Sequence, residues 1–198
     1  HLSGVNAKYL YLFGNIPHTP IEKETSSKSI EVVIFGTPYE KFPFQLLGQR
    51  LNDLSIFLKL PIQIWIIGRQ RETVGLNLIK RISKDYNFSI IECGELSTES
   101  ISKKLQKCDI GISTTSYDIL GKSGAAAAIL EHGLPVITYD DGDTPHEKLF
   151  VFKEFSDQVF LLNEENLTGK IISFLQKKRK PFFDGVAYTA REMISILN

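Results

Sequence analysis

Short runs of apolar, often β-branched residues alternate with longer amphipathic segments from residue 30 to the end of the chain. The short runs predict strands at about residues 30–36, 62–68, 88–93, 109–114, 135–140 and 158–162. Segments of helical period lie at about residues 44–59, 72–86, 98–107, 124–132, 164–178 and 186–197. This alternation predicts an α/β fold: a doubly wound (Rossmann-like), mostly parallel six-stranded sheet with helices on both faces.

The first 29 residues have a different character. An apolar segment at residues 9–13 is followed by Gly14-Asn15-Ile16-Pro17 and by a polar stretch at residues 23–29. This pattern favours an interdomain connector at residues 1–29, a Rossmann-like domain at residues 30–180 and a C-terminal helix at residues 181–198. Because the chain begins with His1 and not with Met, we expect it to be part of a longer protein.

One segment predicts an anion-binding turn. Gly121, Lys122, Ser123 and Gly124 precede four consecutive alanines, and a helix that begins near Gly124 would direct unpaired N–H groups and its positive dipole end into this turn. The alanines allow a close approach of the helix to the sheet. Gly133 suits the left-handed position after the helix, and the next strand follows at once.

The predicted topology places this turn at a ligand-binding position. In doubly wound sheets, ligands bind beyond the carboxyl ends of the strands, where the strand order reverses between the first and the fourth strand. The loop after the first strand contains Thr37 and Lys41. The loop after the fourth contains Thr115, Tyr117 and Asp118 and leads into the turn at Gly121.

Composition narrows the function classes. Lys and Arg total 23, as do Asp and Glu, so the formal net charge is zero, which argues against a nucleic-acid partner. The two cysteines, Cys93 and Cys108, and the four histidines show no metal-ligand spacing and no disulfide framework, so we expect no metal, no cofactor and a reducing, cytoplasmic location. The chain contains no apolar run long enough to cross a bilayer.

Several segments occur in the order of a known family. They are Phe35-Gly36, Ile67-Gly68, Gly94-Glu95-Leu96-Ser97, residues 108–113 and residues 133–137. With these, the chain resembles the C-terminal, donor-binding domain of the GT-B nucleotide-sugar glycosyltransferases, especially the retaining group 4 (group 1-type) family. The resemblance implies a UDP-, GDP- or ADP-linked sugar as donor, transfer of a hexosyl group to a glycan or lipid-linked acceptor, and an N-terminal acceptor domain that this chain lacks.

The resemblance also implies donor-binding residues. Thr37 stands at the place of the family's phosphate-binding arginine, and Lys41 lies near the place of its lysine. Gly94, Glu95 and Leu96 occupy the place where the family holds the base through backbone groups. Arg69, after the second strand, is a further candidate donor contact, and Asp118 is a candidate acceptor of hydrogen bonds from sugar hydroxyls.

The chain departs from the family at an acidic pair. The two family positions fall on Leu120 and Ala128, and the second acid in the family grips the ribose hydroxyls. Glu131 lies one helical turn beyond Ala128, close to the helix carboxyl end, where a negative charge asks for a cation partner or a ligand. We therefore expect a divergent branch, in which Lys122, Ser123 and the helix N-terminus take over part of the phosphate binding.

Two other function classes remain open. Residues 116–123 differ from the phosphate-loop pattern Gly-x4-Gly-Lys-Ser only at the first position, which favours a nucleotide-binding or hydrolysing domain. The unmatched acidic pair favours a non-catalytic Rossmann-like binding domain. The basic run Lys177-Lys178-Arg179-Lys180 fits a solvated helix end, or peripheral contact with anionic lipid at the inner face of the membrane.

Overall fold

The computed structural model describes residues 10–20, 28–69, 74–142 and 153–197. These residues form a six-stranded sheet with the strand order β3-β2-β1-β4-β5-β6, in which every neighbouring pair is parallel. The strands are β1 (Ile30–Phe35), β2 (Ile62–Ile67), β3 (Ser89–Gly94), β4 (Ile110–Ile112), β5 (Val136–Thr138) and β6 (Val159–Leu161). The predicted doubly wound, Rossmann-like fold is confirmed, and its switch point lies between β1 and β4.

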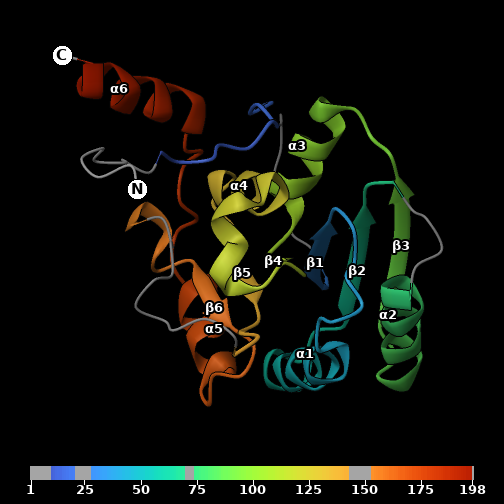
Figure 1. Ribbon diagram of the computed structural model, residues 1–198. Helices are drawn as coiled ribbons and strands as arrows, with labels where there is room; N and C mark the ends of the chain where they lie inside the picture. Colours follow the sequence, from blue (N-terminus) through green and yellow to red (C-terminus); the bar gives the residue numbers. More distant parts are fainter. Residues whose placement is uncertain (1–9, 21–27, 70–73, 143–152, 198) are drawn as a thin grey trace.

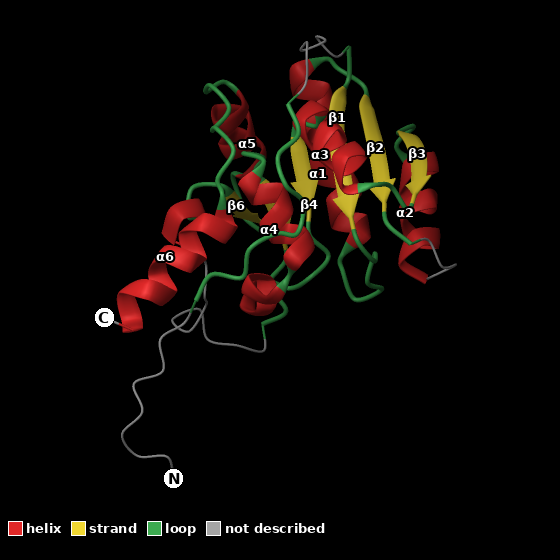
Figure 2. Cartoon of the chain, turned by 90° about the horizontal axis from the view of Figure 1, so that it is seen from above, coloured by secondary structure: helices red, strands yellow, loops and turns green. Residues whose placement is uncertain are grey.

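Helices cover both faces of the sheet (Figures 1 and 2). The α-helices are α1 (Phe44–Leu58), α2 (Val74–Asp85), α3 (Thr98–Lys107), α4 (Gly124–Glu131), α5 (Leu167–Leu175) and α6 (Gly185–Leu197). Two short 3-10 helices, η1 (Tyr117–Lys122) and η3 (Lys153–Phe155), occupy stretches that the sequence pattern leaves as loops. All predicted strands and α-helices are present.

The core has two halves, because successive side chains of a strand point to opposite faces. Val32 and Ile34 of β1 pack with α1, α2 and α5, whereas Val33 packs with α3, α4 and Tyr11 of the N-terminal segment. The strands are therefore apolar on both sides, as a parallel sheet that is covered on both faces requires.

Helix ends follow the sequence signals in two of three instances. Ser97 caps α3 by accepting a hydrogen bond from the Ser100 backbone N–H at 3.2 Å, and Gly133 follows α4 with a φ of 75°. We also expected Asn163 and the two glutamates after it to start the fifth helix, as a cap and acidic first turn do. That expectation is wrong, because α5 begins only at Leu167 and the Glu164 carboxylate instead accepts a hydrogen bond from the Leu161 N–H at 3.0 Å.

Small residues bring α4 close to the sheet. Ala126, Ala127 and Ala128 are buried, and a Cβ atom at Gly111 of β4 would lie 2.3 Å from the Ile129 side chain. A Cβ atom at Gly36, directly after β1, would lie 3.6 Å from the Ala125 Cβ. The first turn of α4 is thus held over the carboxyl ends of β1 and β4, which is the switch point of the sheet.

Residues 10–20 lie against α4 and α6. The Tyr11 ring contacts Phe155, Phe183 and Tyr188 at centroid distances of 5.9, 5.8 and 6.2 Å, and the Thr189 hydroxyl donates to the Tyr11 carbonyl at 3.1 Å. The predicted connector and the predicted C-terminal helix are therefore neighbours in space, although they lie at opposite ends of the chain (Figure 1).

Candidate functional site

A cavity of about 470 Å³ opens at the switch point of the sheet. Its lining comes from the segments that follow β1, β4 and β5 and from the turn into α4: Tyr39, Glu40, Lys41, Thr114, Thr115, Ser116, Ile119, Lys122, Ser123 and Tyr139. Four predicted site residues, Lys41, Thr115, Lys122 and Ser123, thus share one cavity. Its volume lies in the range of small-molecule sites.

Hydrogen bonds fix the loops around this cavity. The Thr114 hydroxyl donates to the Thr37 carbonyl at 2.8 Å and accepts from the Tyr39 N–H at 3.2 Å, so the loop after β1 is tied to the end of β4. On the other side, the Thr138 hydroxyl donates to the Thr115 carbonyl at 2.6 Å. The cavity walls are therefore held in place by the fold itself.

The start of α4 forms one side of the cavity. The Ser123 hydroxyl caps the helix by accepting from the Ala126 N–H at 3.2 Å. The N–H groups of Gly124 and Ala125 belong to the first turn, whose donors have no intrahelical partner, and they carry the positive end of the helix dipole. A Cβ atom at Gly124 would meet nothing within 4 Å, so there is open space at this turn.

The charges at the cavity suit an anion. Lys41 and Lys122 approach it from two different loops and are both exposed, and the hydroxyls of Thr114, Thr115, Ser116 and Ser123 add hydrogen-bonding groups. Burial raises the pKa of Tyr139, with a further contribution from Asp141, so this side chain stays a neutral phenol near pH 7. Two cations, a helix N-terminus and several hydroxyls can together hold a phosphate or diphosphate.

Other predicted residues flank the cavity without lining it. Thr37 contributes its carbonyl to the Thr114 contact described above, and its side chain is exposed. Tyr117 and Asp118 lie in η1, where the Asp118 carboxylate accepts a hydrogen bond from the Ser116 hydroxyl. Gly121 is in the same 3-10 helix. Asp118 therefore orients a hydroxyl that does line the cavity.

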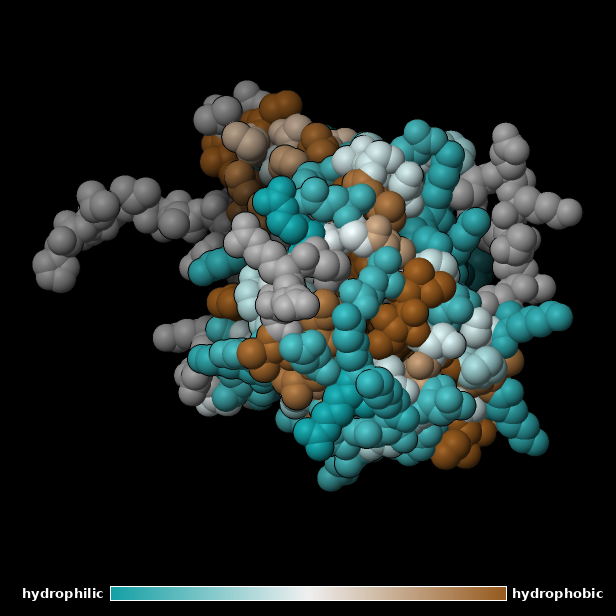
Figure 3. Space-filling view, turned by 90° about the vertical axis from the view of Figure 1, so that its right-hand side faces the viewer, coloured by the Kyte–Doolittle hydropathy of each residue, from teal (hydrophilic) through white to brown (hydrophobic). Residues whose placement is uncertain are grey.

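The candidate base-binding residues lie further along the sheet. Gly94, Glu95 and Leu96 follow β3, which is two strands from β1, or about 10 Å at ordinary strand spacing. Gly94 has a φ of 67° and accepts a hydrogen bond from the Gly68 N–H at 2.8 Å, and Leu96 packs on the core. Figure 3 shows this side of the molecule, where hydrophilic and apolar side chains are mixed.

Arg69 is engaged on this part of the surface. Its Nε atom lies 2.8 Å from the Glu95 carboxylate, and both side chains are about two-thirds exposed, at 67% and 64%. The structure therefore places Arg69 with Glu95 and the end of β3, and it does not bring either residue to the cavity at the switch point.

Glu131 lies at the other end of α4 from the cavity, about 10 Å along the helix axis. It is 2% exposed, and its carboxylate accepts hydrogen bonds from the Tyr11 hydroxyl at 3.0 Å and from the Gly14 N–H at 2.9 Å. Burial raises its pKa, and the two hydrogen bonds act in the opposite direction. The partner that a carboxylate needs at this helix end is the N-terminal segment, so the structure does not place Glu131 among the cavity residues.

The two positions of the family's acidic pair are inside the protein. Leu120 is 2% exposed and Ala128 is fully buried. A Cβ atom at Gly14 would lie 2.7 Å from the Ala128 Cα, so the N-terminal segment covers α4 at this point. Packing therefore occupies the space that a carboxylate at position 128 would need.

Sequence reasoning missed six lining residues, namely Tyr39, Glu40, Thr114, Ser116, Ile119 and Tyr139. Tyr39 and Glu40 adjoin Lys41, and Thr114 and Ser116 flank Thr115, so both stretches could have been taken whole. Tyr139 directly follows β5, and the strand order was the available signal, because β5 is the neighbour of β4.

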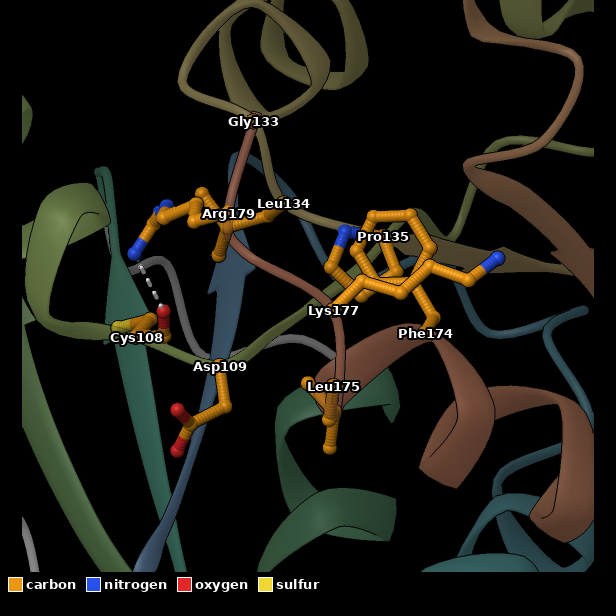
Figure 4. A pocket seen from close by; sticks show the side chains of 9 residues that line it. All are labelled: Cys108, Asp109, Gly133, Leu134, Pro135, Phe174, Leu175, Lys177 and Arg179. Carbon is orange, nitrogen blue, oxygen red and sulfur yellow. Dashed lines mark hydrogen bonds between the residues drawn. The ribbon is translucent and has the colours of Figure 1, made fainter. Parts of the chain in front are cut away.

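A second pocket, of about 100 Å³, lies at the amino ends of β4 and β5 (Figure 4). Arg179, which lines it, donates to the carbonyls of Leu105 at 2.8 Å, Gln106 at 2.7 Å, Cys108 at 3.1 Å and His132 at 3.1 Å. Lys180 pairs with Asp157 at 2.6 Å. Half of the basic run at residues 177–180 is thus committed to structural contacts.

Two further searches concern only the described residues. They contain no group of three or more His, Cys, Asp or Glu side chains arranged to hold a metal ion. None of their helices has the length and apolar character that a bilayer-crossing segment needs. Cys93 and Cys108 are both free, in agreement with their predicted separation.

The fold is that of GT-B glycosyltransferases. The chain is similar to AviGT4, a glycosyltransferase involved in avilamycin A biosynthesis, with a TM-score of 0.56 and 10% identity over 96% of this chain and 57% of that one. It is also similar to S. aureus TarM in complex with fondaparinux, α-GlcNAc-glycerol and UDP, with a TM-score of 0.52 and 17% identity over 88% of this chain and 33% of TarM.

These similarities define a Rossmann-like domain of GT-B type, which spans about a third to just over half of those two chains. The sequence itself matches no protein-family model and no curated protein. The fold is thus shared at very low sequence identity.

Proposed function

We propose that this chain is the donor-binding domain of a glycosyltransferase that uses a nucleoside diphosphate sugar and transfers a hexosyl group to a glycan or lipid-linked acceptor. The observation that carries the proposal is the cavity at the switch point. It combines Lys41, Lys122 and the start of α4 at the place where open α/β sheets bind their ligands. The fold that the chain shares with TarM, which was solved with UDP, supports the same choice of ligand class.

In the proposed arrangement, the diphosphate lies between Lys41 and Lys122 and against the first turn of α4. The sugar lies toward Thr115, Ser116 and Tyr139, with Ser116 oriented by Asp118. The nucleoside extends toward Gly94–Leu96 at the end of β3, because only that direction has free strand ends on the β1 side of the sheet.

The proposed enzyme needs a second, acceptor-binding domain. Glycosyl transfer between two bound substrates requires a cleft that positions both and excludes water, and positioning alone can contribute about 7 to 11 kcal/mol. Leu10, Leu12 and Phe13 are 37%, 41% and 39% exposed beside α6, whose Val186 is 54% exposed. This apolar surface suits contact with such a domain. The chain alone is then expected to bind nucleotide without transferring sugar.

The phosphate-loop alternative is less well supported. In a phosphate loop, successive backbone N–H groups of an open turn surround the phosphates. Residues 117–122 instead form the 3-10 helix η1, in which the Ser123 N–H bonds to the Leu120 carbonyl at 3.0 Å and the Ile119 N–H to the Ser116 carbonyl at 3.3 Å. These donors are therefore directed along η1 and away from a ligand.

Location and membrane contact remain predictions. The free thiols of Cys93 and Cys108 are compatible with the cytoplasm. Lys177 and Lys178 are exposed and take part in no ion pair found among the described residues, so they are the members of the basic run that lipid contact would use. Sedimentation with anionic vesicles, compared between this chain and its Lys177→Glu, Lys178→Glu variant, tests that contact.

Calorimetric titration with UDP, GDP and ADP tests the proposed function. We expect one of the three to bind, and we expect Lys122→Ala to weaken that binding about tenfold, the effect of losing one charge-assisted contact. Lys178→Ala is the matched control, since it removes an exposed lysine far from the cavity along the sequence and outside its lining. No heat with any of the three nucleotides at millimolar concentration would refute the proposal and favour a non-catalytic binding domain.

A further inference from the structure

The cavity offers many groups for phosphate and few for a vicinal diol. Lys41, Lys122 and the first turn of α4 are suited to anions. Glu40 is the one carboxylate among the described lining residues. It adjoins Lys41 on an exposed loop. A ribose diol, in contrast, is typically held by a carboxylate that accepts from its 2′-hydroxyl.

Helix α4 does not supply that carboxylate. Glu131 is the only acidic residue between Gly124 and Glu131, and its carboxylate already accepts hydrogen bonds from Tyr11 and Gly14 at the end of the helix away from the cavity. The ligand-facing half of the helix consists of Gly124 and alanines. That half can therefore offer backbone N–H groups to a phosphate and no acceptor to a hydroxyl.

The N-terminal segment prevents a simple replacement of this acceptor. Gly14 lies directly on Ala128, where its Cβ, if present, would be 2.7 Å from the Ala128 Cα and 2.8 Å from the Ala128 nitrogen. A longer side chain at position 128 has no space beneath this contact. The absence of a carboxylate on the middle of α4 is thus built into the packing of residues 10–20 against the helix.

From this arrangement we infer that the site recognises its ligand through the diphosphate and does not read the ribose 2′-hydroxyl. The inference rests on the proposed function, since it concerns the same cavity. It makes inorganic pyrophosphate a competitive fragment of the ligand, and it makes ribonucleoside and 2′-deoxyribonucleoside diphosphates equivalent ligands.

Calorimetry on the chain with UDP, 2′-deoxy-UDP and inorganic pyrophosphate tests the inference, with the base changed if GDP or ADP is the better ligand. We expect the dissociation constants of the two nucleotides to agree within about twofold, and pyrophosphate to displace both. Lys122→Ala weakens all three by about the same factor, because each loses the same phosphate contact. Lys178→Ala leaves them unchanged.

Two acidic variants locate any ribose preference. Glu40→Gln and Glu131→Gln are each expected to leave the ratio of the two dissociation constants near one. A 2′-deoxynucleotide that binds tenfold or more weakly than its ribonucleotide overturns the inference and leaves the proposed function intact. If Glu40→Gln then abolishes that difference, the loop after β1 reads the ribose.

The failure of the proposed function looks different. If pyrophosphate binds and none of the nucleotides does, the proposed donor is wrong while the diphosphate site stands. If neither pyrophosphate nor any nucleotide binds, both the inference and the proposed function are refuted. Far-ultraviolet circular dichroism of each variant verifies that the exposed substitutions leave the fold unchanged.

Discussion

The Glu131 carboxylate joins the N-terminal segment to α4, and its removal is expected to destabilise the protein. In Glu131→Ala, the Tyr11 hydroxyl and the Gly14 N–H lose their acceptor inside the protein. An unsatisfied buried donor costs about 1–3 kcal/mol. Two such donors set an upper range of about 2–6 kcal/mol.

An opposing effect reduces this loss. The pKa of Glu131 is raised by burial, so the folded protein disfavours the charged carboxylate, and its removal relieves that cost. We therefore expect a net loss of about 2–4 kcal/mol for Glu131→Ala. Glu131→Gln retains an oxygen acceptor and carries no charge, so we expect it to cost about 1 kcal/mol or less.

Urea unfolding followed by circular dichroism measures both free energies, and hydrogen exchange at the Gly14 amide localises the effect. Exchange at Gly14 is expected to be faster in the Ala variant than in the Gln variant. The reasoning fails if Glu131→Gln is as costly as Glu131→Ala, because the charge and not the acceptor would then dominate. It also fails if Glu131→Ala leaves the unfolding free energy unchanged.

The remaining predictions concern stability at three other positions. Arg179→Ala removes four hydrogen bonds to carbonyls near the ends of α3 and α4 and is expected to cost about 2–3 kcal/mol in urea unfolding, whereas Lys178→Ala costs less than about 0.5 kcal/mol; equal values for the two would contradict the contacts. Ala128→Glu is expected to cost about 3 kcal/mol or more, since it inserts a carboxylate at a fully buried position beneath Gly14, and a fully stable variant in thermal unfolding would show that the segment moves aside. Burial lowers the pKa of His132 to about 4 from 6.5, so its protonation favours unfolding, and stability should decrease by up to about 3 kcal/mol as the pH falls from 6.5 toward 4. Glu131, with its raised pKa, acts in the opposite direction above pH 4.5, so comparison with His132→Gln isolates the histidine; an unchanged pH dependence in that variant would exclude it as the cause.

The anion-binding turn shows how far a local pattern can be followed. Gly121–Gly124 and the alanines after them predict a helix that begins at residue 124, and the structure has α4 there, with Ser123 as its cap. The pattern did not predict the 3-10 helix η1 before it, because a few hydrogen-bonded turns leave no periodicity to detect. The placement of Lys41 and Lys122 on one cavity depended on the strand order, which the alternation of strands and helices predicted.

Glu131 shows where local reasoning ends. Its position near a helix carboxyl end indicated that it needs a partner, but nothing nearby in the sequence identified that partner as Tyr11 and Gly14, more than a hundred residues away. Arg179 is similar, since its basic run suggested a solvated end and its guanidinium instead bonds to the ends of α3 and α4. Contacts of this kind depend on how elements distant in sequence pack.

The sequence by itself determined the secondary structure, the parallel sheet and the location of the switch-point loops. These follow from hydrophobic periodicity, from turn residues and from the handedness of strand-helix-strand units, all of which act over short stretches of chain. Only the tertiary structure decided that residues 10–20 cover α4, that Gly14 fills the space over Ala128, and that Tyr39 and Tyr139 face the same cavity. The physical reason is that close packing between distant segments depends on complementary shape, which no local pattern encodes.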